Sequence, residues 1–520
     1  MAWRPARAFP RASLGIASRA PICYYRPHIM VRFGTGGWRA QLCDEFTFLN
    51  VRKVAHTISA SVKENPDYGA ASPDYQAWLG VGKRSPVPVV VVGYDSRFLS
   101  EDFAHEVAAV FALDGIKTVL SASDVPTPAV AAAVLARKAV GGLMITASQS
   151  PAQLNGVKWM PFWGGAATPA VTEDIERRIE LLGTHAIKTM SLDRSLRESW
   201  IETADLRPVY FKQLSSLLDV KAIRRSGIKV AVDAMYGSAR NHLRPFLESL
   251  GVEVTGLHEK RDVLFGGRAP QPAAQSLTEL AQVMVKKRLS LGLACDGDGD
   301  RFGILDAGGR WIPANEVLAL ALEHLVADRG MKGKVARSVM TSHFVDAVAK
   351  SHGLDARETP VGFKYIGDLL RTGQFVLGGE ESGGLSIRGH APDKDGLLAC
   401  LLMLELVACG RKPLAAVRDR LFKRVGAFHN TRQDFPMARP REVQELEERL
   451  RLRPPLDLAG GSVWRIDQSD GFKFILRDGS WLGLRSSGTE PVFRLYAEAH
   501  DPKRLAALVE SGKKLLQGRF

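Results

Sequence analysis

The chain has 520 residues with an ordinary globular composition, 45% hydrophobic and 24% charged, which suggests three to four domains. The formal net charge of +14 would suit a nucleic-acid-binding protein, but the chain has no long basic run and no basic stripe interleaved with aromatic residues, so we expect no nucleic-acid partner. No run of about 18 uncharged apolar residues occurs, so we expect no membrane span. The chain has five cysteines and no CxxC pair, which argues against a disulfide framework and a cysteine zinc site and favours a location in the reducing cytoplasm.

Residues 1–29 differ in composition from the rest of the chain. They contain five arginines and no acidic residue, together with Ser13 and Ser18. This is the composition of an organelle transit peptide. The alternative is a mis-assigned start, with Met30 as the true initiator directly before VRFGTGGWR. Under either interpretation we expect residues 1–29 to lie outside the fold.

One pattern recurs through most of the remaining chain. A β-branched or otherwise apolar run is followed by a polar or glycine-rich loop, and usually then by a helical stretch; the runs are 87–93, 139–145, 228–233, 289–295 and 335–340. Short buried strands that alternate with helices predict α/β domains with mixed, mostly parallel sheets. Ligands bind at the carboxyl ends of strands in such sheets, which is where these polar loops fall.

The last ninety residues have a different pattern. A charged segment at 441–452 predicts an exposed helix, short strands follow near 462–466, 472–476 and 493–498, and a final helix follows Pro502. This is an α+β pattern and predicts a separate domain. We therefore predict four domains, at 30–200, 205–308, 309–428 and 430–520, preceded by the extension 1–29.

The segment CDGDGDR places three carboxylates at alternate positions. In extended chain Asp296, Asp298 and Asp300 point to the same side, and the glycines between them let the backbone bend around one ion. An all-oxygen anionic cluster suits Mg²⁺. An EF-hand is excluded, because its sixth position would be Arg301 and its twelfth Ala307. The alternative is an acidic surface turn, in which three carboxylates would repel one another unless a cation neutralised them.

Three further loops carry polar side chains suited to chemistry. In TASQSP, Ser148 follows an apolar strand and is placed as an exposed nucleophile; a phosphorylated serine would need a cation partner such as the aspartate cluster provides. In GGEESGG, Glu380 and Ser382 are spaced to hydrogen-bond neighbouring sugar hydroxyls, or else form a solvated acidic turn. In RSSGTEPVFR, Arg485 could hold a phosphate in two hydrogen bonds beside a nest-like turn. The chain has no GxxxxGK[ST] and no HExxH segment.

These four loops, in this order and spacing, resemble the α-D-phosphohexomutase family, which includes phosphoglucomutases and phosphomannomutases. The resemblance runs from Val31 to the C-terminus and is supported by FGTGGWR, GYDSR, LFGGRAPQP, ETPVGFKYI and KDG. It implies four domains around a central cleft, the first three α/β and the fourth α+β. In chain order they would supply the phosphoserine, the metal site, the sugar site and a phosphate site.

The resemblance also implies a role for each loop residue. Ser148 would be the phosphoserine and, through its phosphate, a metal ligand beside Asp296, Asp298 and Asp300. The residues around the transferring phosphoryl group would be Arg39, Lys158 and Arg301, with Lys158 a candidate for proton transfer. Glu380 and Ser382 would bind the sugar hydroxyls. The phosphate that does not react would be held by Arg485, Ser487, Gly488, Thr489 and Arg494.

The implied activity interconverts hexose 1-phosphate and hexose 6-phosphate, of glucose and/or mannose, through the phosphoserine and a hexose 1,6-bisphosphate intermediate. Mg²⁺ would be the cofactor and hexose 1,6-bisphosphate the activator, in a cytoplasmic monomer or homodimer whose partner is its sugar phosphate. The alternatives are a phosphoglucosamine-type mutase, a net phosphatase that loses the bisphosphate, and a non-catalytic sugar-phosphate-binding relative.

The serine loop departs from the family pattern. The family usually has histidine and asparagine after the serine, whereas this chain has Gln149 and Ser150. Glutamine cannot act as an acid or base near neutral pH. We therefore expect either a reduced rate or transfer of this task to Lys158, which would need a lowered pKa to act as the base.

Overall fold

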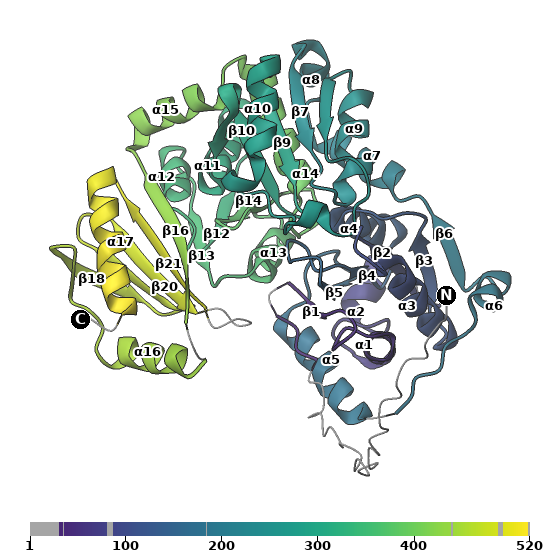
Figure 1. Cartoon of the computed structure of the whole chain (residues 1–520). Coiled ribbons are helices and arrows are strands. Elements are labelled where there is room, and N and C mark those ends of the chain that lie inside the picture. Colours follow the sequence, from purple (N-terminus) through teal and green to yellow (C-terminus); the bar gives the residue numbers. More distant parts are fainter. Residues whose placement is uncertain are drawn as a thin grey trace, which may run out of the picture. The chain divides into compact units, whose positions relative to one another are not determined.

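The computed structural model describes residues 31–34, 36–80, 87–183, 185–437, 440–486 and 492–517 (Figure 1). Residues 31–520 cluster as a single unit, and every contact discussed below lies within it. The described strands form four separate sheets that follow one another along the chain. The prediction of four domains, the last with a different architecture, is confirmed, whereas the extension 1–29 lies outside the described residues and the domain limits stay a prediction.

The first sheet has the strand order β1-β5-β4-β2-β3-β6. Its pairings from β4 through β2 and β3 to β6 are parallel, and β5 and β1 add antiparallel pairings at one side. Val90 and Val92 pack into one core cluster and Val91 into another, so β2 is buried on both faces, which explains its unbroken apolar sequence. Its elements are β1 (Trp38–Gln41), α1 (Phe48–Glu64), α2 (Pro73–Leu79), β2 (Val89–Tyr94), α3 (Ser100–Leu113), β3 (Lys117–Ser121), α4 (Thr127–Arg137), β4 (Gly141–Ile145), β5 (Leu154–Pro161), α5 (Pro169–Leu182), α6 (Leu192–Arg197) and β6 (Ile201–Ala204).

The second sheet has the order β11-β10-β9-β7-β8. The β9–β7 and β7–β8 pairings are parallel, and the β11–β10 and β10–β9 pairings are antiparallel. The central strand β9 is fully buried and ends immediately before the aspartate cluster. The elements are α7 (Arg207–Leu217), α8 (Val220–Ser226), β7 (Lys229–Asp233), η1 (Ser238–Asn241), α9 (Leu243–Ser249), β8 (Glu253–Leu257), η2 (Phe265–Gly267), η3 (Ala274–Leu277), α10 (Thr278–Lys287), β9 (Leu291–Cys295), β10 (Phe302–Asp306), η4 (Ala307–Gly309) and β11 (Arg310–Ile312).

The third sheet has the order β13-β12-β14-β15, with only the β14–β15 pairing antiparallel. Helix α14 is apolar on every side, and almost all of it is buried, as is typical of a helix with this composition. Among the described residues no helix is both long and apolar enough to cross a membrane. The elements are α11 (Ala314–Glu323), η5 (His324–Asp328), β12 (Lys334–Ser338), α12 (Phe344–Ser351), β13 (Ala356–Thr359), α13 (Phe363–Arg371), β14 (Phe375–Glu380), β15 (Gly384–Ile387), α14 (Gly396–Gly410) and α15 (Leu414–Val425).

The fourth sheet is entirely antiparallel, in the order β16-β21-β20-β19-β18-β17. On β21, Phe493, Leu495 and Ala497 pack into a core cluster that includes residues of α16 and α17. Tyr496 leaves the other face and packs in a cluster with Met340 of the third domain. The elements are β16 (His429–Pro436), α16 (Pro440–Leu452), β17 (Asp457–Leu458), β18 (Gly461–Asp467), β19 (Phe472–Leu476), β20 (Trp481–Ser486), β21 (Val492–Ala499) and α17 (Pro502–Leu516).

Candidate active site

The loop that carries Ser148 is held in place by a single buried arginine. Arg97 follows β2 and is 0% exposed. Its Nη2 donates to the carbonyl oxygens of Ser148 and Ser150 at 2.6 and 2.7 Å, and its Nη1 to those of Pro151 and Leu154 at 2.8 and 3.0 Å. Hydrogen bonds from a charged donor are stronger than neutral ones. The guanidinium therefore fixes the backbone from the serine to the start of β5.

Ser148 itself has a strained backbone. Its φ is +53°, in the left-handed region that a residue with a Cβ rarely adopts. The Ser148 N–H donates to Thr146 Oγ1 at 2.8 Å, and the Ser148 Oγ donates to Asp296 Oδ2 at 2.8 Å. The predicted serine and the first predicted metal ligand, 148 residues apart, are thus in direct contact.

The three aspartates that follow β9 form the predicted cluster. One carboxylate oxygen from each of Asp296, Asp298 and Asp300 lies within 4.8 Å of the others, and all three residues are buried. The Oδ1 atoms of Asp298 and Asp300 are buried without a hydrogen-bond partner among the described residues. A buried carboxylate oxygen without a partner is costly, and carboxylate oxygens are hard ligands that suit Mg²⁺. The cluster therefore fits the implied Mg²⁺.

The aspartate loop approaches the serine loop closely at Gly297. A Cβ placed on Gly297 would lie 2.7 Å from the carbonyl oxygen of Ser148. On its other side the loop meets the start of α4, where Thr127 donates to Asp298 Oδ2 through its hydroxyl at 2.5 Å and to the Asp298 carbonyl through its N–H at 2.8 Å. The first two domains are thereby joined at the serine loop and the aspartate cluster.

Lys158 on β5 is the nearest cation to this cluster. Its Nζ lies 2.5 Å from both Asp298 Oδ2 and Asp300 Oδ2. Burial lowers the pKa of Lys158, but Asp298 and Asp300 raise it by more, so its net pKa lies above the ordinary value. This direction is the opposite of what a proton acceptor needs. In this arrangement Lys158 is a cation that balances the two carboxylates.

The pKa values of Asp296 and Asp300 are shifted in opposite directions. Burial raises the pKa of Asp296 well above its ordinary range, and the negative charges of Asp298 and Asp300 raise it further. Burial also acts to raise the pKa of Asp300, but Lys158, Lys394 and Arg301 lower it by more. Lys394, whose Nζ is 3.3 Å from Asp300 Oδ2, belongs to the KDG segment of the third domain. The carboxylates therefore favour the binding of positive charge at Asp296.

The two predicted arginines connect this centre to neighbouring loops. Arg39 on β1 donates from Nη1 to Ser150 Oγ at 3.0 Å, so one of the two unusual residues after the serine has a defined partner. The backbone N–H of Arg301 donates to Asp296 Oδ1 at 3.0 Å, and its Nη1 donates to the Ser382 carbonyl at 2.7 Å and to the Ser382 hydroxyl. Arg301 thus joins the aspartate loop to the predicted sugar loop.

The predicted sugar loop presents its two glutamates differently. Glu380, at the end of β14, is 3% exposed and accepts the N–H of Gly362 at 2.8 Å; burial raises its pKa. Glu381 and Ser382 line a cavity, and Glu381 Oε2 accepts from Ser338 Oγ at 2.9 Å. The structure therefore places Ser382 on the cavity wall and Glu380 behind it.

The predicted phosphate site lies partly outside the described residues, because these exclude Ser487, Gly488 and Thr489. The two flanking arginines are described. Arg485 on β20 donates from Nε to Asp470 Oδ1 at 2.8 Å. Arg494 pairs directly with Arg485 across the β20–β21 ladder, and its buried Nε has no hydrogen-bond partner in the described part of the chain. Two guanidiniums therefore lie side by side on one sheet face.

A cavity of about 590 Å³ is lined by residues of all four domains. Its wall includes Gln149 of the serine loop, Arg301, Ser382 of the sugar loop, and Arg432 and Tyr496 of the fourth domain. Gln149, which stands where the family usually has histidine, is thus available to a ligand. The cavity is large enough for a sugar phosphate.

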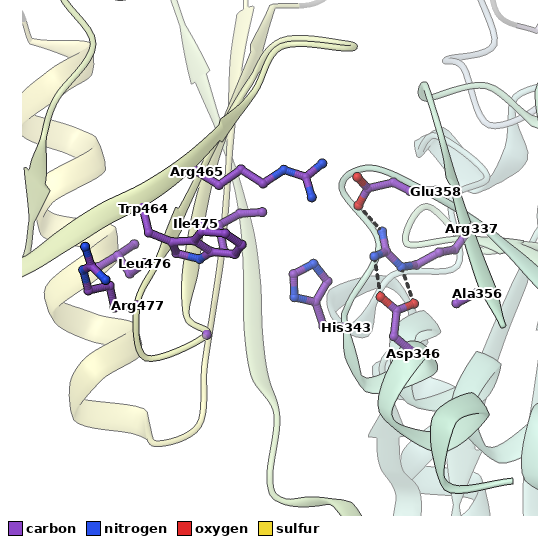
Figure 2. A pocket seen from close by; sticks show the side chains of 11 residues that line it. Arg337, His343, Asp346, Ala356, Glu358, Trp464, Arg465, Ile475, Leu476 and Arg477 are labelled. Carbon is purple, nitrogen blue, oxygen red and sulfur yellow. Dashed lines mark hydrogen bonds and ion pairs between the residues drawn. The ribbon is translucent and has the colours of Figure 1, made fainter. Parts of the chain in front are cut away.

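A second cavity, of about 530 Å³, lies between the third and fourth domains (Figure 2). At its wall Arg337 donates to Asp346 at 2.5 and 2.7 Å and to Glu358 at 2.5 Å. The buried cation of this cavity is therefore balanced by two carboxylates, and the described wall of the cavity holds none of the predicted site residues. The first cavity is the candidate active site.

Four family profiles match the chain. They are the phosphoglucomutase/phosphomannomutase α/β/α domains I, II and III, at residues 76–184, 208–309 and 313–425, and the C-terminal domain of the same family at 434–512. The chain belongs to the phosphoglucomutase/phosphomannomutase family. The resemblance found in the sequence is confirmed, and with it the fold class.

Individual members of this family align over most of the chain. A phosphoglucomutase of Komagataeibacter xylinus is 27% identical over 505 residues, which cover 90% of this chain and 87% of that protein. A phosphoglucosamine mutase of Frankia casuarinae is 32% identical over 437 residues, covering 82% and 88%. A crystal structure from Thermus thermophilus, assigned as a phosphomannomutase, has 30% identity and a TM-score of 0.78 over 94% of this chain and 100% of that one. These relatives are mutases, so the prediction of an intramolecular phosphotransferase is confirmed at the level of the family.

Several residues of the site were not singled out from the sequence. Arg97 was noted only as part of GYDSR and Lys394 only as part of KDG, whereas Thr127 and Arg432 were not noted. Family motifs could have drawn attention to the first two. Thr127 and Arg432 stand in segments without a recognisable pattern, and only the folded chain brings them to the site.

Proposed function

We propose that the protein interconverts the 1-phosphate and the 6-phosphate of a hexose, glucose and/or mannose, through a phosphoserine at Ser148 and a hexose 1,6-bisphosphate. One observation carries this proposal. The Ser148 Oγ lies 2.8 Å from Asp296, within the three-carboxylate cluster, on a loop that Arg97 fixes in a strained conformation. A serine in contact with a candidate magnesium site suits a group that carries a phosphoryl dianion.

The reaction consists of two phosphoryl transfers. In the first, the bond between Ser148 Oγ and phosphorus breaks, a bond forms between phosphorus and the free sugar hydroxyl oxygen, and the hydroxyl proton leaves to a base. In the second, the bond between the phosphorus of the other phosphate and its sugar oxygen breaks, that phosphorus bonds to Ser148 Oγ, and the freed sugar oxygen takes back a proton to become a hydroxyl. The sugar then leaves with its phosphate on the opposite end, and the enzyme is again phosphorylated.

The residues around Ser148 supply charge and position. Arg39, Lys158 and Arg301 surround the reacting serine and would stabilise negative charge on the transferring group. Mg²⁺, held by Asp296, Asp298, Asp300 and an oxygen of phosphorylated Ser148, would neutralise part of the same charge when bound. Lys158 is the proposed proton-transfer group, but it could accept the hydroxyl proton only after leaving Asp298 and Asp300, because this pairing keeps it protonated.

The distant end of the substrate needs a site that does no chemistry. Glu380 and Ser382 are the proposed ligands of the sugar hydroxyls; Ser382 lines the cavity, whereas Glu380 would have to turn from its contact with Gly362 to reach a hydroxyl. The proposed site for the other phosphate comprises Arg485, Ser487, Gly488, Thr489 and Arg494. Because either phosphate of the bisphosphate must fit this site in turn, it has to recognise phosphate rather than one particular end of the sugar.

A second substrate is supported by the relatives. Both the Frankia casuarinae relative and a 30% identical relative from Methanothermobacter thermautotrophicus, the latter with "probable" in its name, are described as phosphoglucosamine mutases. Glucosamine 1-phosphate is therefore the second candidate substrate. Comparison of its turnover with that of glucose 1-phosphate and mannose 1-phosphate, under equal conditions, identifies the preferred sugar.

The test is conversion of each hexose 1-phosphate to its 6-phosphate, with Mg²⁺ and a trace of glucose 1,6-bisphosphate. We expect turnover in the wild type and its loss in Ser148→Ala, with the neighbouring Ser150→Ala retaining far more activity than Ser148→Ala. Release of free phosphate instead of the 6-phosphate would indicate a phosphatase. An inactive wild type on all three sugars would refute the proposal.

A further inference from the structure

A third arginine joins the face of the fourth domain that bears Arg485 and Arg494. In the β16–β21 ladder Asp434 pairs with Arg494 and Arg432 pairs with Tyr496. Residues two apart on a strand leave the same face, so Arg432 and Asp434 share the face of Arg494. Arg432, Asp434 and Tyr496 line the wall of the active-site cavity. Nothing in the sequence pattern around Arg432 identified it as a site residue.

Arg432 is paired with a carboxylate of its own strand. Its Nε donates to Asp434 Oδ1 and its Nη2 to Asp434 Oδ2, both at 3.1 Å. This two-bond arrangement is the one in which a guanidinium also binds a phosphate. Asp434 Oδ2 lies 3.9 Å from Arg494 Nε, too far for a hydrogen bond, and that nitrogen is the one buried without a partner among the described residues. Asp434 thus lies between Arg432 and Arg494 and accepts hydrogen bonds only from Arg432.

The pair is partly open to the cavity. The side chain of Arg432 is 33% exposed and that of Asp434 is 47% exposed, so a ligand in the cavity can reach both. An ion pair of this exposure contributes little to folding, typically below about 1 kcal/mol. A competing dianion can therefore break the pair with little loss of stability. Arg432 then makes two charge-assisted hydrogen bonds to the ligand in place of those to Asp434.

We propose that Arg432 is a further binding residue for the phosphate that does not react, and that Asp434 is an internal anion which occupies Arg432 until a substrate phosphate displaces it. This proposal rests on the proposed function for the identity of the substrate. It assigns opposite effects to the two members of one ion pair. Loss of Arg432 removes a phosphate ligand, whereas loss of the charge on Asp434 removes a competitor and a repulsive neighbour of the phosphate.

The opposite signs separate this role from a structural one. If the pair only stabilised β16, removal of either partner would have the same small effect. A matched control pair exists on another strand of the same sheet. Arg465 on β18 donates from Nη2 to Asp467 Oδ2 at 3.1 Å, also two residues apart, but it lines the second cavity (Figure 2).

The experiment measures binding by isothermal titration calorimetry in the Ser148→Ala background, where no phosphoryl transfer follows. The probes are glucose 6-phosphate and, separately, inorganic phosphate. We expect Arg432→Gln to weaken the binding of both probes about 10-fold or more, and Asp434→Asn to tighten it about 3- to 10-fold. Arg432→Lys, which keeps the charge without the planar fork, should lie between wild type and Arg432→Gln. The control variants Arg465→Gln and Asp467→Asn should bind as the parent does.

The outcomes are distinct. Unchanged binding in Arg432→Gln overturns the proposal, as does weaker binding in both Arg432→Gln and Asp434→Asn, because the latter is the result of a purely structural pair. Absence of inorganic phosphate binding in the parent also overturns it. If no form binds glucose 6-phosphate but inorganic phosphate follows the expected order, Arg432 binds phosphate as proposed and the assigned hexose substrate is wrong.

Discussion

The two ends of the candidate active site, the serine and aspartate loops at one and the face of the fourth domain at the other, hold their charged groups in opposite ways. At the reacting end, Ser148, Lys158 and the three aspartates are all buried, and Arg97 fixes the backbone around the serine through four carbonyl oxygens. At the other end, Arg432 is partly exposed and is paired with a carboxylate two residues away on its own strand. One end is fully desolvated, and the other remains in contact with solvent.

This difference follows from what each end would have to do. A transferring phosphoryl group needs groups that are already in position and shielded from water, because electrostatic stabilisation is strongest without reorganisation. A site that must accept either end of a bisphosphate has to release and rebind its ligand between the two transfers. Ion pairs of low strength suit that exchange, since they can be broken at little cost.

The largest effect is expected from a change to the aspartate cluster. Asp298→Asn keeps the size of the side chain but removes one of three charges that would hold Mg²⁺, and it leaves Lys158 with one carboxylate fewer. We expect kcat to fall about 100- to 1,000-fold, with a higher Mg²⁺ concentration needed for half-maximal activity. Steady-state assays over a Mg²⁺ titration measure both effects.

A buried aspartate of the same domain provides the control. Asp306 accepts the N–H groups of Leu414 and Ala415 at 3.0 and 2.9 Å and so caps α15, away from the serine. Asparagine also caps helices, so Asp306→Asn should leave kcat and the Mg²⁺ dependence unchanged. If both variants lose activity equally, the effect of Asp298→Asn is on folding and not on the site.

An intermediate effect is expected from the contact between the aspartate and serine loops. In Gly297→Ala the new methyl group would lie 2.7 Å from the Ser148 carbonyl oxygen, so one of the two loops must move by several tenths of an ångström. We expect kcat to fall about 10- to 100-fold with a small change in KM, because the reacting groups and not the distant phosphate site are displaced.

The matched variant is Gly410→Ala at the end of α14, where an added Cβ meets no atom within 4 Å. This variant should keep the wild-type kcat. A Gly297→Ala enzyme with unchanged kcat would show that the serine loop tolerates displacement, which would contradict the fixed geometry described for the reacting end.

The smallest effect is expected on the pH dependence of stability, from a buried lysine at the contact between the fourth domain and the third. Lys473 on β19 is 0% exposed and bonds to the carbonyl oxygen of Val339 at 2.6 Å, to His343 Nε2 at 2.9 Å and to Glu358 at 3.1 Å. Burial, followed by the positive charge of Arg337, lowers the pKa of Lys473 to about 8, while Glu358 opposes the shift. The pKa of a lysine in the unfolded chain is about 10.4.

Between these two pKa values the unfolded chain binds a proton that the folded chain does not, so stability gained from Lys473 rises with pH across this window. Below about pH 8 both states hold the proton, and the cost of burying the charge is fully present. We therefore compare the free energies of unfolding in urea of wild type and Lys473→Met at about pH 7 and about pH 9.5. The value for wild type, relative to that for the variant, should rise with pH by at most about 1.4 kcal/mol per pH unit. The variant Lys514→Met, at an exposed lysine, serves as the control. A difference between wild type and Lys473→Met that is independent of pH would contradict the lowered pKa.

The sequence allowed the four domains, the serine and the aspartate cluster to be predicted, because in each case the chemistry is contained in one short segment. Asp296, Asp298 and Asp300 are neighbours in the chain, and their repulsion alone indicates a cation. Arg97 is different, because its four acceptors are backbone carbonyl oxygens, which have no sequence signature. Its contact with the serine loop became visible only in the structure.

Two other features depend on how strands align and end. Arg432 meets Arg494 and Asp434 through the register of β16 and β21, which no local pattern encodes. Glu380 and Glu381 are adjacent, and the point at which β14 ends determines that Glu381 lines the cavity while Glu380 is buried behind it. A shift of one residue reverses which side chain faces a ligand, and sequence patterns locate strand ends only to within a few residues.

The most direct test of the account is the phosphorylation state of Ser148 itself. The protein would be incubated with glucose 1,6-bisphosphate and Mg²⁺ and then freed of small molecules. It would be digested for peptide mass spectrometry before and after separate addition of the 1-phosphates of glucose, mannose and glucosamine, with no further phosphoryl donor. Before the sugar is added, we expect one phosphoryl group on Ser148. After the addition, we expect this group to have moved to the hexose monophosphate, which becomes a hexose bisphosphate. A phosphoryl group on a different residue, or a phosphorylated Ser148 that passes its group to none of the three hexose phosphates, would contradict the account.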